Sequence, residues 1–367
     1  MRDLVIIATG DLILDVPDAD HWLGAIAPVL RSADLAIGHL EVPHGTSVAE
    51  LAGDVPAPAA PPENVAAIAR AGFGAVTLAG NHIADCGAEG IVETRALLDA
   101  EGIGHCGAGP DAETAFAPLI WEAGGRRIGL LSYNCVGPEA AWAQPGRAGC
   151  AWLRVETSDG SAIAPAAPLT AVSEEALTRL ADDIAALREK ADLVLVSLHK
   201  GLVHTPARLA PYERDIAHAA VRSGADAVFS HHAHIVRGIE FVDGRPVFHG
   251  LGNGCVVTHA LAPAQDHPVR AAWAERRKKL FGFEPDPAFH LAPFHPEAVN
   301  GFMARLIISP EGKIEARIEP VDVVAPGRPQ PAMGDRAAAI RRYVEDITVK
   351  AGLPPIRIDA ENRVLAA

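Results

Sequence analysis

Polar side chains that can bind metal ions recur directly after short apolar segments of this chain. The residues in such positions are Asp11, Glu41, Asn81, His82, His199, His231, His232 and His234. Imidazole and carboxylate groups together suit Zn, Mn, Fe or Ni. Six or seven ligands are too many for one tetrahedral ion, and they fit two ions about 3.5–4 Å apart that share a carboxylate. The pattern therefore predicts a dinuclear metal site that activates water for hydrolysis.

Each of these residues also has an ordinary structural interpretation. Asp11 could cap a helix, Glu41 could be a solvated acid in a loop, and Asn81 could be a turn residue. His82 could be a buried histidine with a hydrogen-bond partner. The segment 231–234 is harder to explain in this way, because three imidazoles within four residues are costly to bury without a ligand.

Short apolar segments alternate with segments of helical spacing, which predicts an α/β protein. The predicted strands are 4–8, 33–40, 75–78, 103–105, 117–121, 127–132, 192–198 and 225–229. The predicted helices are 21–31, 62–71, 90–101, 173–190, 209–223 and 337–351. Hairpins are predicted for 236–249 and 301–320, whereas 134–172 and 258–300 are predicted to be irregular apart from a helical piece at 269–280. The carboxyl ends of strands in open α/β sheets form a ligand-binding crevice, so we expect the polar residues to meet there.

These polar segments resemble, in the same order, the motifs of the CapA family, which is named for poly-γ-glutamate capsule synthesis. They are Gly10-Asp11, His39-Leu40-Glu41, Gly80-Asn81-His82 with Asp85, His199-Lys200-Gly201, His231-His232-Ala233-His234 and Leu251-Gly252-Asn253. The resemblance covers roughly residues 3–257. Because the family is related to the calcineurin-like metallophosphoesterases, it implies an α/β/β/α sandwich of that type, with two mixed sheets flanked by helices.

The resemblance also implies a role for each motif residue. The implied ligands of two divalent transition-metal ions (Mn, Zn or Fe) are Asp11 and His234 for one ion, Glu41 as the bridge, and Asn81, His199 and His232 for the other. His82 is implied to act on the substrate as an acid or electrostatic stabiliser, oriented by Asp85. Capping of the next helix is the alternative for Asp85.

The chain departs from the family pattern at several positions. His39 stands where Asn is common, Lys200 where Trp is common, and Ala233 where Pro is common. Residue 13 is Ile, whereas the wider superfamily has a His there. This last difference predicts a first metal site that is poor in ligands.

Further basic and imidazole side chains lie close to the motifs. We expect Lys200, Arg237 and His231 to bind a small anionic substrate, with solvent exposure as the alternative for the two cations. Other nearby histidines are expected to support the ligands or to face solvent: His39, His44, His204 and His249. The basic run at 276–279 is interpreted as the polar face of a helix.

Composition narrows the classes of partner. The chain has 46 acidic and 32 basic residues and a net charge of −14, which argues against binding to nucleic acid or to an anionic membrane. Five cysteines without CxxC spacing predict neither a disulfide framework nor a four-cysteine zinc site. The apolar runs are too short to span a membrane, so we expect a cytoplasmic protein, and a homo-oligomer is compatible with the sequence.

The motifs lie within the first two thirds of the chain, which sets the expected organisation. We expect residues 1–257 to form a metallophosphoesterase-like core and 258–367 to pack on it as part of the same domain. The expected function is metal-dependent hydrolysis of a phosphoester, a γ-glutamyl or other amide, or a cyclic amide or ester. The alternative is a non-catalytic, metal-binding accessory protein of poly-γ-glutamate or capsule biosynthesis, which we rank second because the sequence shows no membrane anchor.

Overall fold

Strand β1 (Leu4–Leu14) is an almost continuous apolar run and is buried along nearly its whole length. Such a sequence is typical of a strand that is covered on both faces. The computed structural model describes residues 2–52, 54–262 and 266–367. In it, β1 pairs in parallel with β2 (Leu35–Leu40) and β15 (Asn253–Val257), and antiparallel with β16 (Asn300–Ile308).

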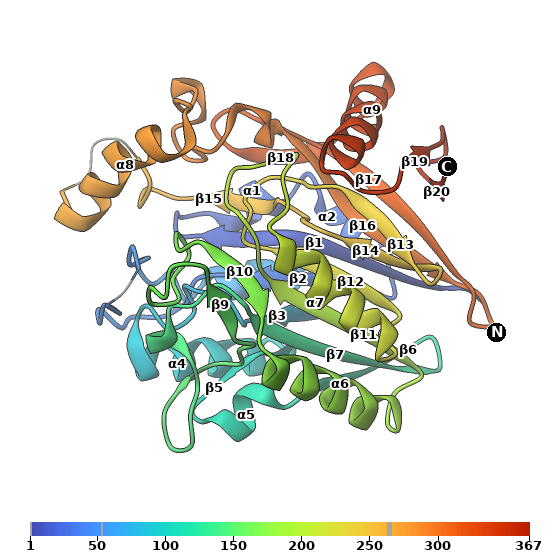
Figure 1. The fold of residues 1–367 in the computed structure, drawn as a ribbon. Helices are drawn as coiled ribbons and strands as arrows, with labels where there is room; N and C mark the ends of the chain where they lie inside the picture. Colours follow the sequence, from blue (N-terminus) through green and yellow to red (C-terminus); the bar gives the residue numbers. More distant parts are fainter. Residues whose placement is uncertain (1, 53, 263–265) are drawn as a thin grey trace.

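Two mixed sheets form the centre of the molecule (Figure 1). The larger sheet has the order β18-β17-β16-β1-β2-β3-β4, with β15 beside β1. Its further strands are β3 (Ala75–Thr77), β4 (Gly104–Cys106), β17 (Ile314–Val324) and β18 (Arg328–Pro331). The second sheet has the order β13-β14-β12-β11-β7-β6. Its strands are β6 (Leu119–Ala123), β7 (Arg126–Asn134), β11 (Leu193–His199), β12 (Ala227–His231), β13 (Ile239–Val242) and β14 (Arg245–Phe248).

The two faces of each sheet pack against different partners. Ile6 and Ile37 of the larger sheet share a buried cluster with Leu195 and Phe229 of the second sheet. The alternate side chains of both sheets pack against helices in another cluster. These helices are α1 (Ala19–Leu23), α2 (Ala27–Leu30), α3 (Asn64–Ala71), α4 (Gly87–Ala100), α6 (Glu174–Arg188) and α7 (Pro211–Arg222). The predicted α/β architecture of two mixed sheets flanked by helices is confirmed.

The region after residue 257 contributes to the same larger sheet. Strands β16 and β17 form the hairpin predicted from the sequence and extend the sheet beyond β1. Helix α9 (Gly334–Lys350) packs on this part of the sheet, and β19 (Ile356–Ile358) pairs with β20 (Val364–Ala366). Helix α8 (Pro268–Phe281) corresponds to the predicted helical piece. No helix among the described residues is long and apolar enough to cross a membrane.

Several element boundaries differ from the predictions for local reasons. The single helix predicted at 21–31 is divided into α1 and α2, because Pro28 favours the first turn of a new helix. The stretch 134–172 is not wholly irregular. It contains β8 (Gly149–Cys150), β9 (Val155–Thr157), β10 (Leu169–Val172) and the 3-10 helix η1 (Glu139–Ala141). Strand β5 (Ala108–Gly109) pairs with β8, and α5 (Ala112–Phe116) follows it.

Candidate metal centre

Asp11 lies inside β1 and not after its end, which corrects the predicted strand boundary. The pairing of β1 with β2 shifts register between Ala8 and Asp11, so the strand carries a local irregularity there. Such bulges re-aim side chains, often beside active sites. Gly10 allows the close approach of β1 to the loop before β15, because a Cβ atom at this position would overlap the Gly252 carbonyl oxygen.

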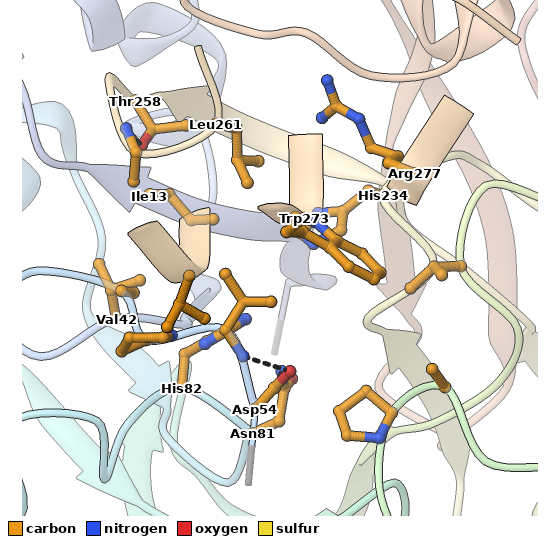
Figure 2. Close-up of a pocket in the computed structure, with 18 of the residues that line it drawn as sticks. Ile13, Val42, Asp54, Asn81, His82, His234, Thr258, Leu261, Trp273 and Arg277 are labelled. Atoms are coloured by element: carbon orange, nitrogen blue, oxygen red, sulfur yellow. Dashed lines mark hydrogen bonds between the residues drawn. The ribbon is translucent and has the colours of Figure 1, made fainter. Parts of the chain in front are cut away.

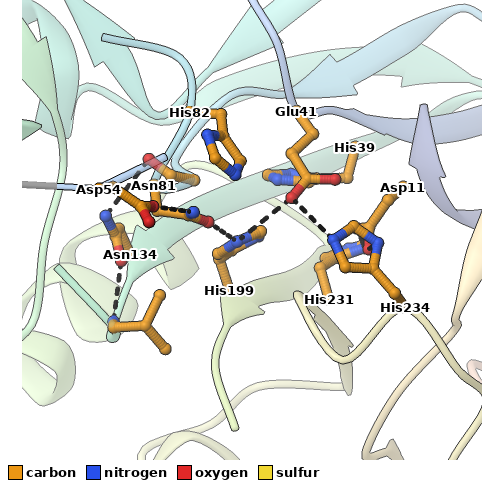
Figure 3. A network of polar contacts seen from close by, with 12 residues as sticks. Asp11, His39, Glu41, Asp54, Asn81, His82, Asn134, His199, His231 and His234 are labelled. Atoms are coloured by element: carbon orange, nitrogen blue, oxygen red, sulfur yellow. Dashed lines mark hydrogen bonds and ion pairs between the residues drawn. The ribbon is translucent and has the colours of Figure 1, made fainter. Parts of the chain in front are cut away.

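Glu41 stands between two groups of metal-binding side chains (Figure 3). One group is Asp11, Glu41 and His234, and the other is Glu41, His199 and His232; within each, the candidate ligand atoms lie within 4.8 Å of one another. Oε1 of Glu41 is 3.5 Å from Nε2 of His234 and 3.9 Å from Nε2 of His199. The structure therefore brings together the predicted bridge and the predicted ligands on either side of it.

Asn81 joins the second group through its amide oxygen. Oδ1 of Asn81 is 2.6 Å from Nε2 of His199, and the Asn81 amide nitrogen donates to Asp54 at 2.7 Å. Asp54 therefore fixes which end of the amide faces the cluster. This aspartate comes from the loop after β2, and nothing in its local sequence distinguishes it from a solvated acid.

Two further histidines extend the cluster beyond the predicted ligands. Nδ1 of His231 is 3.3 Å from Oδ1 of Asp11, so His231 lies beside a predicted ligand. His39 forms a third metal-binding group with Asp11 and His199, and its ring stacks on that of His231 at 4.6 Å. Nδ1 of His39 contacts the Thr77 hydroxyl at 2.9 Å, whereas Nε2 has no hydrogen-bond partner among the described residues and is available to the cluster.

Hydrogen bonds within the protein do not satisfy this cluster. In the described part of the chain, the buried atoms without a hydrogen-bond partner include both carboxylate oxygens of Asp11, both of Glu41, both ring nitrogens of His232, Nε2 of His39, Nδ1 of His199 and Nδ1 of His231. Buried polar groups are normally paired, and unpaired ones are costly. Imidazole nitrogens and carboxylate oxygens are the donors that transition metals bind, so the residues present fit a metal site.

Burial also sets the charge state of the donors. It lowers the pKa of His39 and of His231 to about 3, and it lowers the pKa of His232 well below the usual value. The imidazoles are therefore neutral at physiological pH, which is the form that binds metal. Burial raises the pKa of Asp11 and of Glu41, and Asp11 raises that of Glu41 further. Two carboxylates held so close together are stable as anions only beside a cation.

His82 and Asp85 form a separate pair at the edge of the cluster. Nδ1 of His82 is 2.7 Å from Oδ2 of Asp85, and this oxygen also accepts from the Ala57 amide at 2.6 Å. Burial by itself would lower the pKa of His82, but neighbouring carboxylates, Asp85 foremost, raise it to about 10. Asp85 does not cap α4, whose N-cap residue is Cys86, so the alternative role of Asp85 is excluded.

A cavity of about 810 Å³ opens over the cluster (Figure 2). Asn81, His82, His232 and His234 line it, so the metal-binding side chains face the same space. The other walls are largely apolar and include Ile13, Val42, Leu261, Trp273 and Phe294. A small substrate can therefore reach the cluster from this side.

Lys200 and Arg237 do not line this cavity. Both are fully buried, and Glu213 lies 3.3 Å from Nζ of Lys200 and 2.8 Å from Nη1 of Arg237. Their charges are used within the protein core, because a buried cation needs a paired anion. We therefore no longer assign either side chain to substrate binding, and solvent exposure, the alternative, is wrong as well.

Burial and secondary structure also test the ordinary structural interpretations of the other residues. Glu41 is fully buried, so it is not a solvated loop acid, and Asp11 lies in a strand, so it is not a helix cap. The four additional histidines are all buried. His204 lines the cavity and lies 6.0 Å from the His234 ring, whereas His249 contacts Lys200 and Glu240 behind the cluster.

Comparison with known sequences identifies the family of this chain. The model of the family described as bacterial capsule synthesis protein PGA_cap matches residues 5–256. The Mycobacterium tuberculosis protein named "Probable polyglutamine synthesis accessory protein" is 30% identical over 199 residues, which are 52% of this chain and 47% of that protein. The Bacillus anthracis capsule biosynthesis protein CapA is 25% identical over 240 residues, 64% of this chain and 53% of that protein.

The chain thus spans about half the length of these two relatives. Among solved structures, the calcineurin-like phosphoesterase YfkN from Bacillus subtilis is similar, with a TM-score of 0.35 and 11% sequence identity. That alignment covers 95% of this chain and 98% of the YfkN chain.

Proposed function

The chain belongs to the PGA_cap family of bacterial capsule synthesis proteins, and on this premise we propose that it is a metal-dependent hydrolase. The proposed reaction is hydrolysis of a small anionic substrate at a dinuclear centre. The bond cleaved is a phosphoester, a γ-glutamyl or other amide, or a cyclic amide or ester.

One observation carries this proposal: the unpartnered carboxylate of Glu41 is shared by two groups of buried ligands. A purely structural metal site would need a single group of about four ligands closed around one ion. Here the ligands form two adjoining groups, and the cavity leaves one side open. An open side is what a catalytic centre needs, because the substrate must reach it.

When bound, two divalent ions would supply Lewis acidity that activates water and stabilises developing negative charge. Asp11 and His234 would hold one, Asn81, His199 and His232 the other, and Glu41 would lie between them. Mn, Zn or Fe would suit these donors.

His82 supplies the remaining chemistry at the cavity wall. Asp85 accepts from Nδ1, which directs Nε2 of His82 away from the Asp85 carboxylate. From this position, Nε2 donates a proton to a leaving group or stabilises a developing oxyanion. Asp85 also binds the loop at Ala57 and therefore positions His82 relative to that wall.

Family membership also supports a second candidate function, that of a non-catalytic metal-binding accessory protein in polymer synthesis. The two curated relatives are named for capsule biosynthesis and for polyglutamine synthesis. In that case the same cluster would bind metal for stability or assembly, and His82 would have no effect on any turnover.

Metal analysis and a hydrolysis screen test the proposal together. The purified protein should contain about one to two transition-metal ions per chain. Phosphoesters, amides and lactones should be offered with Mn, Zn, Fe and Ni added separately. Turnover of one class supports the hydrolase, whereas bound metal without turnover supports the accessory function, and the absence of metal overturns both.

His82→Ala then separates catalysis from metal binding. This variant should keep its metal and lose about 10²- to 10⁴-fold in kcat, because general acid catalysis contributes about that factor. His290→Ala removes an exposed histidine and should leave kcat unchanged. Loss of metal from His82→Ala would instead identify His82 as a ligand.

A further inference from the structure

Arg277 is a buried cation on the wall of the cavity. It comes from α8, the helix of the basic run, and only 2% of its surface is exposed. It lines the same cavity as Asn81, His82 and His234. Its neighbours in the run are more open to solvent: Lys279 is exposed, and Lys278 lies 3.3 Å from Glu284. Arg276 is exposed and also borders the cavity.

Within the described residues, two nitrogen atoms of the Arg277 guanidinium lack a hydrogen-bond partner. Nε and Nη1 are buried without a hydrogen bond, and no carboxylate of the described chain forms an ion pair with it. The buried Arg237 is different, because it is paired with Glu213. A buried arginine stays protonated, so without a partner it is costly to keep in place. An anion from outside the protein would satisfy it.

The acids of the cavity wall do not fill this role. Asp15 accepts from the Thr258 hydroxyl at 2.6 Å and from the His259 amide at 3.2 Å. Asp54 accepts from the Asn81 amide. Both carboxylates are engaged with other groups, and Arg277 has no partner among the described acids of the cavity wall.

Aromatic contacts connect α8 with the metal centre. Phe281 of α8 lies 4.9 Å from the His204 ring, and His204 lies 6.0 Å from the ring of the candidate ligand His234. Figure 2 shows Trp273 and Arg277 of α8 on the same side of the cavity as His234. The unpartnered cation therefore borders the space in which a bound substrate would lie.

We propose that Arg277 is an anion-binding subsite that receives a carboxylate or phosphate group of the substrate. The proposal deepens and rests on the proposed hydrolase function. The planar guanidinium presents two parallel N–H groups, which fit either anion in a bidentate manner. The apolar walls around it, including Ile13, Val42 and Trp273, would contact an uncharged part of the substrate between this anion and the bond that is cleaved.

Anion binding can be measured without knowing the substrate. Inorganic phosphate and glutarate serve as probes, titrated by calorimetry into the full chain, both manganese-loaded and chelator-treated. Arg277→Gln should weaken binding of at least one probe about tenfold or more in the chelator-treated protein, since hydrogen bonds to a charged group are among the stronger ones. Lys279→Gln removes the same charge from the same helix and should leave binding unchanged. The probe with the larger loss identifies the anion, and equal binding by both variants overturns the proposal.

Thermal stability excludes a merely structural role. Removing an unpaired buried charge should not destabilise the fold, so Arg277→Met should have an unchanged or higher Tm without anion. The increase in Tm that phosphate or glutarate gives to the unmodified protein should disappear in this variant. A lower Tm of Arg277→Met without anion, together with unchanged anion binding by Arg277→Gln, would show that Arg277 only supports the fold.

The experiment distinguishes failure of the anion-binding subsite from failure of the hydrolase proposal. Binding of the probes through Arg277 to a protein that takes up no metal would keep the subsite and remove the hydrolase proposal. Metal uptake and turnover without any effect of Arg277→Gln on probe binding would do the reverse.

Discussion

Two clusters of buried charged residues meet at the end of β11, because His199 belongs to one of them and Lys200 to the other. In the first, Lys200 and Arg237 share the carboxylate of Glu213, and Lys200 also contacts His249. In the second, Asp11 and Glu41 lie among imidazoles and have no hydrogen-bond partner. Both clusters are buried, but a cavity borders the second one. Among the described residues, only the first is close to complete in itself, with Nε of Arg237 as its unpaired atom.

The difference shows how a structural ion cluster is distinguished from a ligand site. Charges of opposite sign that satisfy one another hold elements together and need nothing from solution. Carboxylates that lie among neutral imidazoles, without hydrogen-bond donors or cations, lack a compensating positive charge. A metal ion can supply that charge. The sequence alone places Lys200 and Arg237 close to the candidate ligands without showing their partners, so only the pairing separates the two clusters.

The largest expected effect concerns the paired cluster. Glu213→Ala should lower the free energy of unfolding by about 3–5 kcal/mol, because it leaves the buried Lys200 and Arg237 without their anion. Urea denaturation measures this change. Asp346→Ala, which removes an exposed ion pair with Lys350, should cost less than about 1 kcal/mol. A similarly small loss for Glu213→Ala would mean that the paired cluster does not stabilise the fold.

Substitution of Glu41, unlike that of Glu213, should not destabilise the metal-free protein. In chelator-treated protein, Glu41→Gln should leave the Tm unchanged or raise it, because the substitution removes a carboxylate beside Asp11. Added manganese at a hundred times its Kd should stabilise the unmodified protein by about 2.7 kcal/mol and should not stabilise the variant. Glu89→Gln, at an exposed position of α4, is the matched control and should respond as the unmodified protein does. If Glu41→Gln kept the metal-dependent stabilisation, Glu41 would not be the bridge.

Substitution of His39 should have a smaller effect on metal affinity, and it tests whether His39 belongs to the ligands. His39→Ala should weaken metal binding about tenfold, measured by competition with a chelator, because His39 faces Asp11 and His199 with a free ring nitrogen. His44→Ala removes an equally buried histidine outside the candidate metal groups and should leave the affinity unchanged. Equal affinities of the two variants would restrict His39 to packing against its neighbours.

The parts of the site that could be predicted from the sequence are those that follow strands directly. Glu41 comes after the apolar run of β2 and His199 closes that of β11, so strand periodicity fixes their place at the sheet edge. The α/β class was predictable for the same reason, since long buried strands have a distinct composition. The arrangement in two mixed sheets followed only from the resemblance to the family.

The parts that could not be predicted depend on contacts between distant segments. Asp54 lies in a loop without periodicity, and its contact with Asn81 exists only after the fold has formed. Arg277 belongs to a basic run that looks like any solvated helix face, and α8 has no clear apolar side to reveal which residue turns inward. Lys200 was predicted to bind substrate because it lies close to the motifs in the sequence. Its partner Glu213 lies in α7, and their ion pair exists only in the folded protein.

The place of β1 in its sheet has a consequence for how the protein is made. Asp11 is synthesised well before β15 and β16, which cover one edge of its strand and end at Val257 and Ile308. Until the ribosome has released these distant segments, β1 has an open edge and the strand that carries Asp11 lacks its final neighbours. A metal ion would therefore meet the complete candidate centre only after β16 has emerged.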